Sequence, residues 1–238
     1  IQRVIESIEQ EIGINVSIYI LDNHSTDGSW EYIEELNKTR ASISAIRMPF
    51  NSGPHYASQL ILKGNFHEYT LFASGNDLLA KINTINRMIA YLDMHKDVNL
   101  VYARNLRGNS YSEPRQFSFS VPGKSRRSEL GLTDIDCFNQ CTWLYTSSEP
   151  LWGIYRSSYS KLIPSLNGYG VDHLMISSVG FYGGITGIND GLKIVGEEKR
   201  SLQTLLASQI QCKYIDTQEN QHNNRAQPLD SSNFLSLM

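Results

Sequence analysis

The chain has 238 residues, of which 40% are hydrophobic and 19% are charged, so it can bury a substantial core and form one ordinary domain. Its formal net charge of -3 gives no basic surface of the kind that nucleic-acid-binding proteins carry, which argues against DNA or RNA binding. The three cysteines, Cys137, Cys141 and Cys212, are an odd number without metal-binding spacing, which indicates reduced thiols rather than disulfides or a zinc site.

The chain opens on a predicted helix at residues 1–12, where Val4, Ile5, Ile8 and Ile12 recur at helical spacing. An α/β sheet normally places a strand before such a helix, so we expect the chain to be a fragment or a trimmed domain. The following elements alternate between strand and helix, which predicts parallel strands with crossover helices. In chain order these are a strand at 16–21, a helix at 29–37, a strand at 43–47, a helix at 54–63, a strand at 69–73, a helix at 82–95 and a strand at 98–102.

The second half is less regular. Residues 104–131 are rich in Ser, Pro, Gly and Arg, which predicts a mobile loop with one exposed hairpin strand at 115–121. The elements expected after it are a strand at 150–156, a short helix to 164, a helix at 168–182, strands at 184–188 and 192–195, and a helix at 199–211. The polar residues from about 218 to 238 are expected to be loosely ordered.

Two of the predicted buried strands run directly into polar turns. The first strand leads into Asp22–Gly28, and the strand at 69–73 leads into Ser74–Asp77. Because an open α/β sheet presents its ligand-binding groups at such strand ends, we expect the two turns to share one cleft. The alternative is that both are plain turns, with Ser25 or Thr26 capping the next helix and Gly28 easing the bend.

These segments resemble the family 2 glycosyltransferases, inverting enzymes that move a sugar from a nucleotide diphosphate to an acceptor hydroxyl. Asp22–Gly28 match the end of the family's Val-Asp-Asp-Gly-Ser-Thr-Asp-Gly pattern, with Asn23 in place of the second acid. Asn51-Ser52-Gly53 match its Asn-x-Gly, and Ser74–Asp77 fall on its metal-binding Asp-x-Asp-Asp, of which only Asp77 is retained.

The resemblance covers residues 1 to about 200 and implies an α/β protein of the GT-A fold, with a mostly parallel central sheet flanked by helices. It implies a nucleotide-sugar-binding half at 1–103, an acceptor-side half of the same domain at 104–215, and a polar tail at 216–238.

The donor site follows from the same resemblance. Its expected residues are Asp22, Asn23, Ser25, Asn51, Gly53, Ser74, Gly75 and Asn76. Asn23 would face the base of a UDP or dTDP sugar, where an amide oxygen can still accept a hydrogen bond from the ring N–H. Asp77 and the neutral carbonyl of Asn76 would bind a divalent cation, Mn²⁺ or Mg²⁺, more weakly than two acids would. Ser74–Asp77 can also be explained as a turn built from turn-forming residues.

On the acceptor side, the resemblance places the general base at Asp172, which follows a Gly-rich turn at a helix start. An acid in that location is also explained as an N-cap or a first-turn charge. Trp152, Arg156 and His173 lie in the segments expected to bind the acceptor, although core packing explains Trp152 and surface exposure explains His173.

Other side chains are weaker candidates. Lys199 and Arg200 could approach the diphosphate or could simply face solvent, whereas Trp30 and Trp143 are assigned to packing.

The expected partners are a nucleotide-sugar donor and a glycan or lipid-linked acceptor, in polysaccharide biosynthesis. The resemblance implies a cytoplasmic protein with peripheral association at the inner face of the membrane. One alternative is a catalytically degenerate module that binds nucleotide or glycan without turnover, because acids are absent at Asn23, Ser74 and Asn76. A nucleotidyltransferase is a further alternative, but that reaction calls for a Gly-rich basic loop that the sequence does not show.

Overall fold

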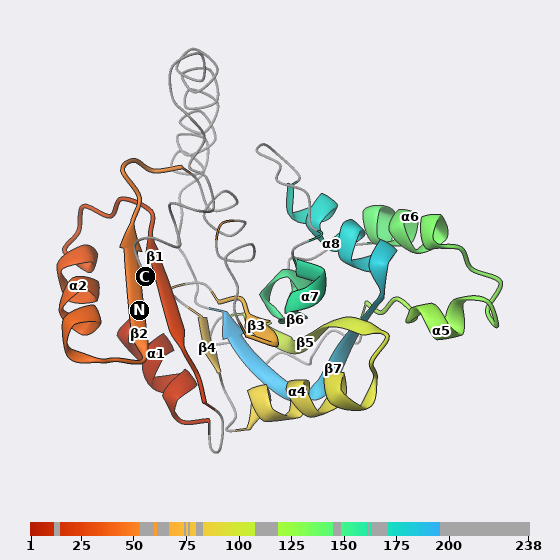
Figure 1. Cartoon of the computed structure of the whole chain (residues 1–238), viewed down its shortest axis with the longest axis horizontal. Helices are drawn as coiled ribbons and strands as arrows, with labels where there is room; N and C mark the ends of the chain where they lie inside the picture. Colours follow the sequence, from red (N-terminus) through yellow and green to blue (C-terminus); the bar gives the residue numbers. More distant parts are fainter. Residues whose placement is uncertain are drawn as a thin grey trace, which may run out of the picture. The chain divides into compact units, whose positions relative to one another are not determined.

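The computed structural model describes residues 1–11, 15–52, 60, 67–73, 75, 77–79, 83–107, 119–144, 149–160, 162 and 171–195. The chain divides into two compact units (Figure 1). The first comprises Ile1–Ile18, His67–Pro164 and Gly170–Glu197, and the second comprises Tyr19–Phe66, Ser165–Tyr169 and Glu198–Met238. Strand β5, Val98–Arg107, belongs to the first unit.

The second unit is built from strand β1 (Ile18–Asp22), helix α2 (Ser29–Thr39) and strand β2 (Ile43–Arg47). The two strands are hydrogen-bonded neighbours, and α2 connects the end of one to the start of the other. The apolar side chains buried in these elements are Ile20, Ile33, Leu36, Ile43 and Met48. The strands and helix predicted at 16–21, 29–37 and 43–47 are therefore confirmed.

The first unit contains a five-stranded sheet in the order β3-β6-β5-β7-β4. The strands other than β5 are β3 (Tyr69–Leu71), β4 (Asp77–Leu79), β6 (Ile154–Arg156) and β7 (Gly184–Val195). β5 and β7 pair in parallel, whereas the other three pairings are antiparallel. The predicted α/β class is correct, but this sheet is mixed rather than mostly parallel. Hydrophobic patterning does not encode strand direction, and the three-residue strands at the edges are too short to reveal it.

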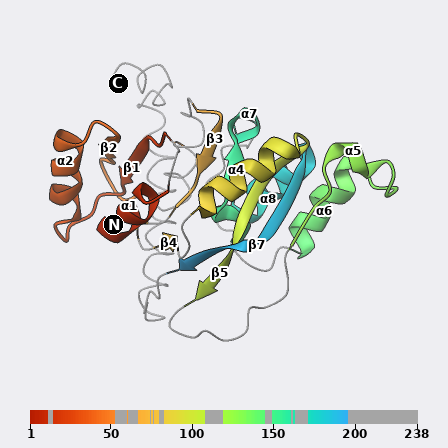
Figure 2. The same cartoon turned by 90° about the horizontal axis from the view of Figure 1, so that it is seen from below.

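Helices cover both faces of this sheet. Helix α4 (Thr84–Met94) buries Ile85, Met88 and Leu92 against apolar side chains of β5 and β6, which are Val98, Val101, Ala103 and Ile154. Figures 1 and 2 show α8 (Val171–Tyr182) on the opposite side of β5 and β7 from α4. Helix α6 (Asp134–Leu144) packs on α8. The opening helix is α1, Gln2–Glu9, in which Val4 and Ile5 are buried as predicted.

The segment predicted as a mobile loop at 104–131 is partly regular. β5 continues to Arg107, and a short helix, α5, forms at Lys124–Arg127. Val121, expected in an exposed hairpin strand, is 1% exposed and forms an isolated antiparallel bridge with Ile185. The prediction failed because Val121 is stabilised by a partner 64 residues along the chain (185 − 121), which local composition does not reveal. Residues 108–118 lie outside the described part.

Later elements also differ from the expected boundaries. The strand predicted at 150–156 divides into a 3-10 turn, η1 (Glu149–Trp152), followed by β6, and the next helix is only α7, Ser157–Ser160. The two strands predicted at 184–188 and 192–195 form one strand, β7, in which residues 189–191 are an irregularity in the pairing with β5. The predicted helix at 199–211 and tail at 216–238 lie outside the described residues, as does all but Leu60 of the helix predicted at 54–63.

No helix in the described part of the chain combines the length and the hydropathy that a bilayer-crossing segment requires. The two cysteines in this part, Cys137 and Cys141, are buried free thiols.

Candidate functional site

The turn after β1 is held by Asp22, which is 4% exposed. Both carboxylate oxygens accept from the backbone N–H of Ser25, at 3.3 and 3.1 Å. The Nε atom of Arg47, at the end of β2, lies 3.4 Å from Asp22 Oδ2, and Arg47 Nη2 donates to the Ser25 carbonyl at 2.7 Å. Asp22 therefore fixes the turn from inside, with Arg47 bracing it from the neighbouring strand.

Asn23 joins this turn to the segment after β2. Its Nδ2 donates to Asn51 Oδ1 at 2.8 Å. Its Oδ1 accepts from the backbone N–H of Ser52 at 2.8 Å and from the Ser52 hydroxyl at 3.0 Å. The structure therefore brings Asp22, Asn23, Ser25 and Asn51 together at one end of the two strands, in the second unit.

Two residues with positive φ shape the same turn. His24 has φ 65°, and its Nδ1 lies 3.2 Å from the Met48 carbonyl oxygen. Gly28 has φ 87° and is the N-cap of α2 without a side-chain capping bond, so neither Ser25 nor Thr26 is the cap. Asp27 Oδ1 instead accepts from the Ser29 N–H at 3.1 Å, and the Ser29 hydrogen bonds lower the pKa of this carboxyl. Gly28 thus eases the bend, as the alternative interpretation predicted, but neither Ser25 nor Thr26 forms the cap that it assigned to them.

The proposed metal-binding segment lies in the first unit. Asp77 is the first residue of β4 and pairs with Val195 of β7. Gly75 precedes it, and a Cβ built there would meet only Ile1 Cδ1, at 3.8 Å. Ser74, Asn76 and, in the other unit, Gly53 lie outside the described residues. The part of the chain that can be inspected holds no group of three or more His, Cys, Asp or Glu side chains suited to a metal ion.

Asp172 lies in the first turn of α8 and is half-buried. Within the described residues its carboxylate makes no hydrogen bond, so it does not act there as a capping group. Asp136, in the first turn of α6, provides a contrast. Its carboxylate accepts from the Thr133 N–H and hydroxyl, while its own N–H donates to Thr133 Oγ1. His173, beside Asp172, is also half-buried.

Arg156 is part of the framework of the first unit. It is 9% exposed, and its guanidinium donates to the carbonyl oxygens of Leu92 at 2.6 Å and Val98 at 3.4 Å. It also contacts Tyr69, whose hydroxyl donates to Asp93 at 2.6 Å. These contacts make Arg156 part of the framework that holds the last turn of α4, and its role in acceptor binding stays a prediction.

The three tryptophans differ in their burial and in the side chains that they contact. Trp152, proposed as an acceptor contact, stacks on Phe72 with ring centroids 5.0 Å apart and is half-buried, as core packing predicted. Trp30 lies under the guanidinium of Arg47, 5.6 Å from ring centroid to Cζ. Trp143, assigned to packing from the sequence, is 80% exposed, so that assignment is wrong. It lies near the end of α6, a helix that the sequence analysis did not predict.

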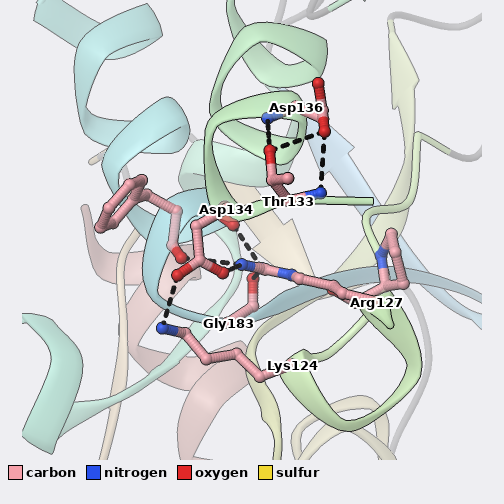
Figure 3. A network of polar contacts seen from close by, with 9 residues as sticks. Lys124, Arg127, Thr133, Asp134, Asp136 and Gly183 are labelled. Atoms are coloured by element: carbon pink, nitrogen blue, oxygen red, sulfur yellow. Dashed lines mark hydrogen bonds and ion pairs between the residues drawn. The ribbon is translucent and has the colours of Figure 1, made fainter. Parts of the chain in front are cut away.

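A buried cation that the sequence analysis missed holds the far end of α8 (Figure 3). Arg127 is 3% exposed and donates to the carbonyl oxygens of Gly180, Phe181 and Gly183, at 2.5, 2.8 and 2.9 Å. Asp134 pairs with Arg127 and with Lys124. The hydrogen bond from Lys124, and to a smaller extent that from Arg127, lowers the pKa of the Asp134 carboxyl. The Thr-x-x-Asp spacing at residues 133–136 signals the start of α6, but no local signal marks Arg127.

Comparison with known proteins identifies the fold. Residues 1–152 match the family model described as glycosyl transferase family 2. No curated protein sequence matches the chain.

Several solved structures are similar to this one. The *S. aureus* TarS 1–349 structure has a TM-score of 0.61 and 17% identity, and the match covers 82% of this chain and 56% of TarS 1–349. Mannosyltransferase PcManGT from Pyrobaculum calidifontis, in complex with GDP-Man and Mn²⁺, has a TM-score of 0.58 and 12% identity, with coverage of 84% and 54%. GalNAc-T7 with UDP, GalNAc and Mn²⁺ has a TM-score of 0.55 and 11% identity, with coverage of 82% and 40%. This chain thus spans little more than half the length of the first two, and the likeness shows that it has the GT-A fold.

Proposed function

Because the chain belongs to the family 2 glycosyltransferases, we propose that it transfers a sugar from a UDP or dTDP donor to a hydroxyl of a glycan or lipid-linked acceptor, with inversion. The observation that carries the donor half of this proposal is the joined cluster of Asp22, Asn23, Ser25 and Asn51. A turn already fixed by hydrogen bonds can bind a nucleotide without the entropic cost of ordering it.

Asp172 is the proposed general base. Its carboxylate would take the proton of the acceptor hydroxyl while that oxygen attacks the anomeric carbon and the bond from that carbon to the diphosphate oxygen breaks. Attack from the side opposite the diphosphate inverts the anomeric configuration. Support comes from the half-buried position of Asp172 at a helix start and from a carboxylate that is not used for capping by the described residues. His173 and Trp152, which are both half-buried, stay in the proposal as acceptor contacts.

A divalent cation is the proposed cofactor. Asp77, and Asn76 through its side-chain oxygen, would supply the ligands from the protein, and oxygen ligands suit Mn²⁺ and Mg²⁺. When bound, such an ion neutralises charge on the departing diphosphate. With one carboxylate and one neutral amide, the pair should bind the ion weakly in the absence of the diphosphate. Ser74, Gly75 and Gly53 remain proposed donor contacts.

Similar proteins support the donor class. TarS 1–349 has been solved in complex with UDP, and this structure has a TM-score of 0.61 with the present one at 16% identity. PcManGT and GalNAc-T7 were solved with a nucleotide or nucleotide sugar together with Mn²⁺. From the family resemblance of the sequence we also propose action in polysaccharide biosynthesis, at the cytoplasmic face of a membrane.

Substitution of Asp172 tests the proposal. Asp172→Asn keeps the shape and removes the base, so the rate of sugar transfer should fall roughly 100- to 10,000-fold, the range for loss of a general base. The affinity for UDP, measured by isothermal titration calorimetry, should stay within about twofold because the base does not bind the nucleotide.

The matched control is Asp136→Asn, which removes another first-turn carboxylate that serves only to cap α6. It should keep the transfer rate. If the wild type binds UDP and transfers no sugar to any tested acceptor, the chain is a degenerate binding module instead. If Asp172→Asn retains full turnover, Asp172 is not the base.

A further inference from the structure

Most of the hydrogen-bonding capacity of the Asn23 side chain is already used by partners within the second unit. A carboxamide has an oxygen with two acceptor sites and a nitrogen with two hydrogens. The oxygen accepts two hydrogen bonds from Ser52, one from its backbone N–H and one from its hydroxyl. One hydrogen of Nδ2 goes to Asn51 Oδ1. What remains is one N–H.

The orientation of the Asn23 amide is determined by its hydrogen-bond partners. The oxygen and nitrogen of a carboxamide have nearly the same size and shape, so which atom is which has to be assigned from the hydrogen-bond partners. The backbone N–H of Ser52 can only donate, and it lies 2.8 Å from the atom assigned as Oδ1. That atom must therefore be the oxygen. Turning the amide would place N–H against N–H and lose the bond from the Ser52 backbone N–H.

We propose that Asn23 recognises the nucleotide base as a hydrogen-bond donor, through its remaining Nδ2 hydrogen, to a carbonyl oxygen of the base. This inference rests on the proposed function, with the base at Asn23 as the family resemblance implies. It replaces the expectation that the amide oxygen accepts from the ring N–H, because both acceptor sites of that oxygen are used by Ser52. The ligand class is a nucleotide whose base carries ring carbonyls, as uracil and thymine do.

The position suits this role. Asn23 is half-buried, so its amide is held from one side while part of it stays accessible. Within the described residues, the second Nδ2 hydrogen has no acceptor. Asp22, directly before it, is turned inward to Ser25 and Arg47 and is 4% exposed, so its carboxylate is poorly placed to accept from a base. Asn23 is thus the specificity-determining side chain of this turn.

The decisive variant is Asn23→Asp. The new carboxylate can still accept both hydrogen bonds from Ser52, so this part of the join between the two segments is kept. The amide nitrogen is replaced by an acceptor, which removes the free N–H and also the hydrogen bond to Asn51 Oδ1. A donor role predicts weaker UDP and dTDP binding, by roughly 3- to 10-fold for one lost hydrogen bond. An acceptor role predicts the opposite sign, since a carboxylate accepts from a ring N–H more strongly than an amide does.

Asn37→Asp is the matched control for charge. It makes the same chemical change in the same unit, at an exposed residue of α2 whose Oδ1 accepts from the Ala45 N–H. UDP affinity of this variant should equal that of the wild type. If it falls as far as that of Asn23→Asp, repulsion of the diphosphate explains the loss and the donor role is wrong.

A second measurement identifies the contacted atom. 2-Thio-UDP and 4-thio-UDP each replace one carbonyl oxygen by sulfur, a weaker acceptor. At least one of them should bind the wild type more weakly than UDP by the same factor as the Asn23→Asp loss, and should show no such difference in the variant. Tighter or unchanged UDP binding by Asn23→Asp, or wild-type binding of both thio analogues as tight as that of UDP, would overturn the inference alone. A wild type that binds no nucleotide diphosphate would overturn the proposed function with it.

Discussion

The thiol of Cys141 lies at the contact between α6 and α8. Cys141 is fully buried, and a Cβ added to Gly180 of α8 would overlap its Sγ. Desolvation, and next the neighbouring Cys137, raise the pKa of the Cys141 thiol to about 12. Glycine at position 180 is therefore required by close approach, because α6 and α8 meet over this sulfur. The same burial makes the thiol unreactive, since the thiolate is the nucleophile.

This burial predicts how Cys141 reacts and how stability depends on pH. At pH 8 its labelling by a thiol reagent should be at least roughly 100-fold slower in the native protein than in urea, because less than about 0.1% of a thiol with this pKa is ionised. The folded-state pKa is raised, so the stabilising contribution is present below the unfolded value near 9 and is lost as the pH rises from 9 toward 12. Urea unfolding at pH 8.5 and 10.5 measures this loss, which Cys141→Ala should reduce. Native labelling at the unfolded rate would contradict the burial.

At the scale of elements, two buried arginines stabilise the C-terminal ends of two helices. Arg127 donates to three carbonyl oxygens at the end of α8, and Arg156 donates to Leu92 in the last turn of α4. The last carbonyls of a helix lack partners within it and carry partial negative charge, so a guanidinium with several donors suits both needs. The proposed base, Asp172, stands at the other end of α8. The network in Figure 3 therefore secures the helix that carries it.

Removal of Arg127 should destabilise the fold strongly. Arg127→Ala leaves the Asp134 carboxylate and four carbonyl oxygens without this partner, those of Pro122, Gly180, Phe181 and Gly183. The expected loss is about 3–5 kcal/mol in the free energy of unfolding. Arg126→Ala is the control, because Arg126 is exposed and its side chain makes no hydrogen bond in the described part of the chain. It should change stability by less than about 0.5 kcal/mol. Urea denaturation measures both, and equal losses would show that the network does not hold α8.

At the scale of the whole molecule, the chain is a member of glycosyl transferase family 2 with the GT-A fold, and it divides into two compact units. The candidate donor turn is in one unit, while Asp77 and Asp172 are in the other. Because a ligand that binds only the native state stabilises it, donor binding can be read from thermal unfolding of the full chain.

UDP at about 100 times its Kd should therefore stabilise the chain by about 2.7 kcal/mol, which raises the Tm by roughly 5–10 °C for a protein of this size. Mn²⁺ should increase the UDP shift, and EDTA should remove the increase. Mn²⁺ alone should give little shift, because one carboxylate and one amide make a weak site. An identical UDP shift in EDTA would contradict the proposed cofactor.

Local pattern was sufficient for much of the fold. Apolar spacing predicted α1, β1, α2 and β2, and order and spacing of short motifs predicted the family. The local pattern was insufficient where a residue's structure depends on contacts with residues distant in sequence. Val121 was placed in a loop although it pairs with Ile185, and Trp143 was assigned to the core although it is exposed.

For the candidate site too, the sequence predicted one part and only the tertiary structure determined the other. The sequence by itself determined which residues stand at the strand ends, because Asp22, Asn23 and Asn51 follow buried apolar runs in motif order. Only the tertiary structure decided which hydrogen bonds these side chains form. The Asn23 oxygen accepts from Ser52, 29 residues away, and Arg156 donates to the Leu92 carbonyl oxygen in the last turn of α4. The physical reason is that burial patterns depend on neighbours along the chain, whereas the use of a donor or an acceptor depends on which partners folding brings within about 3 Å.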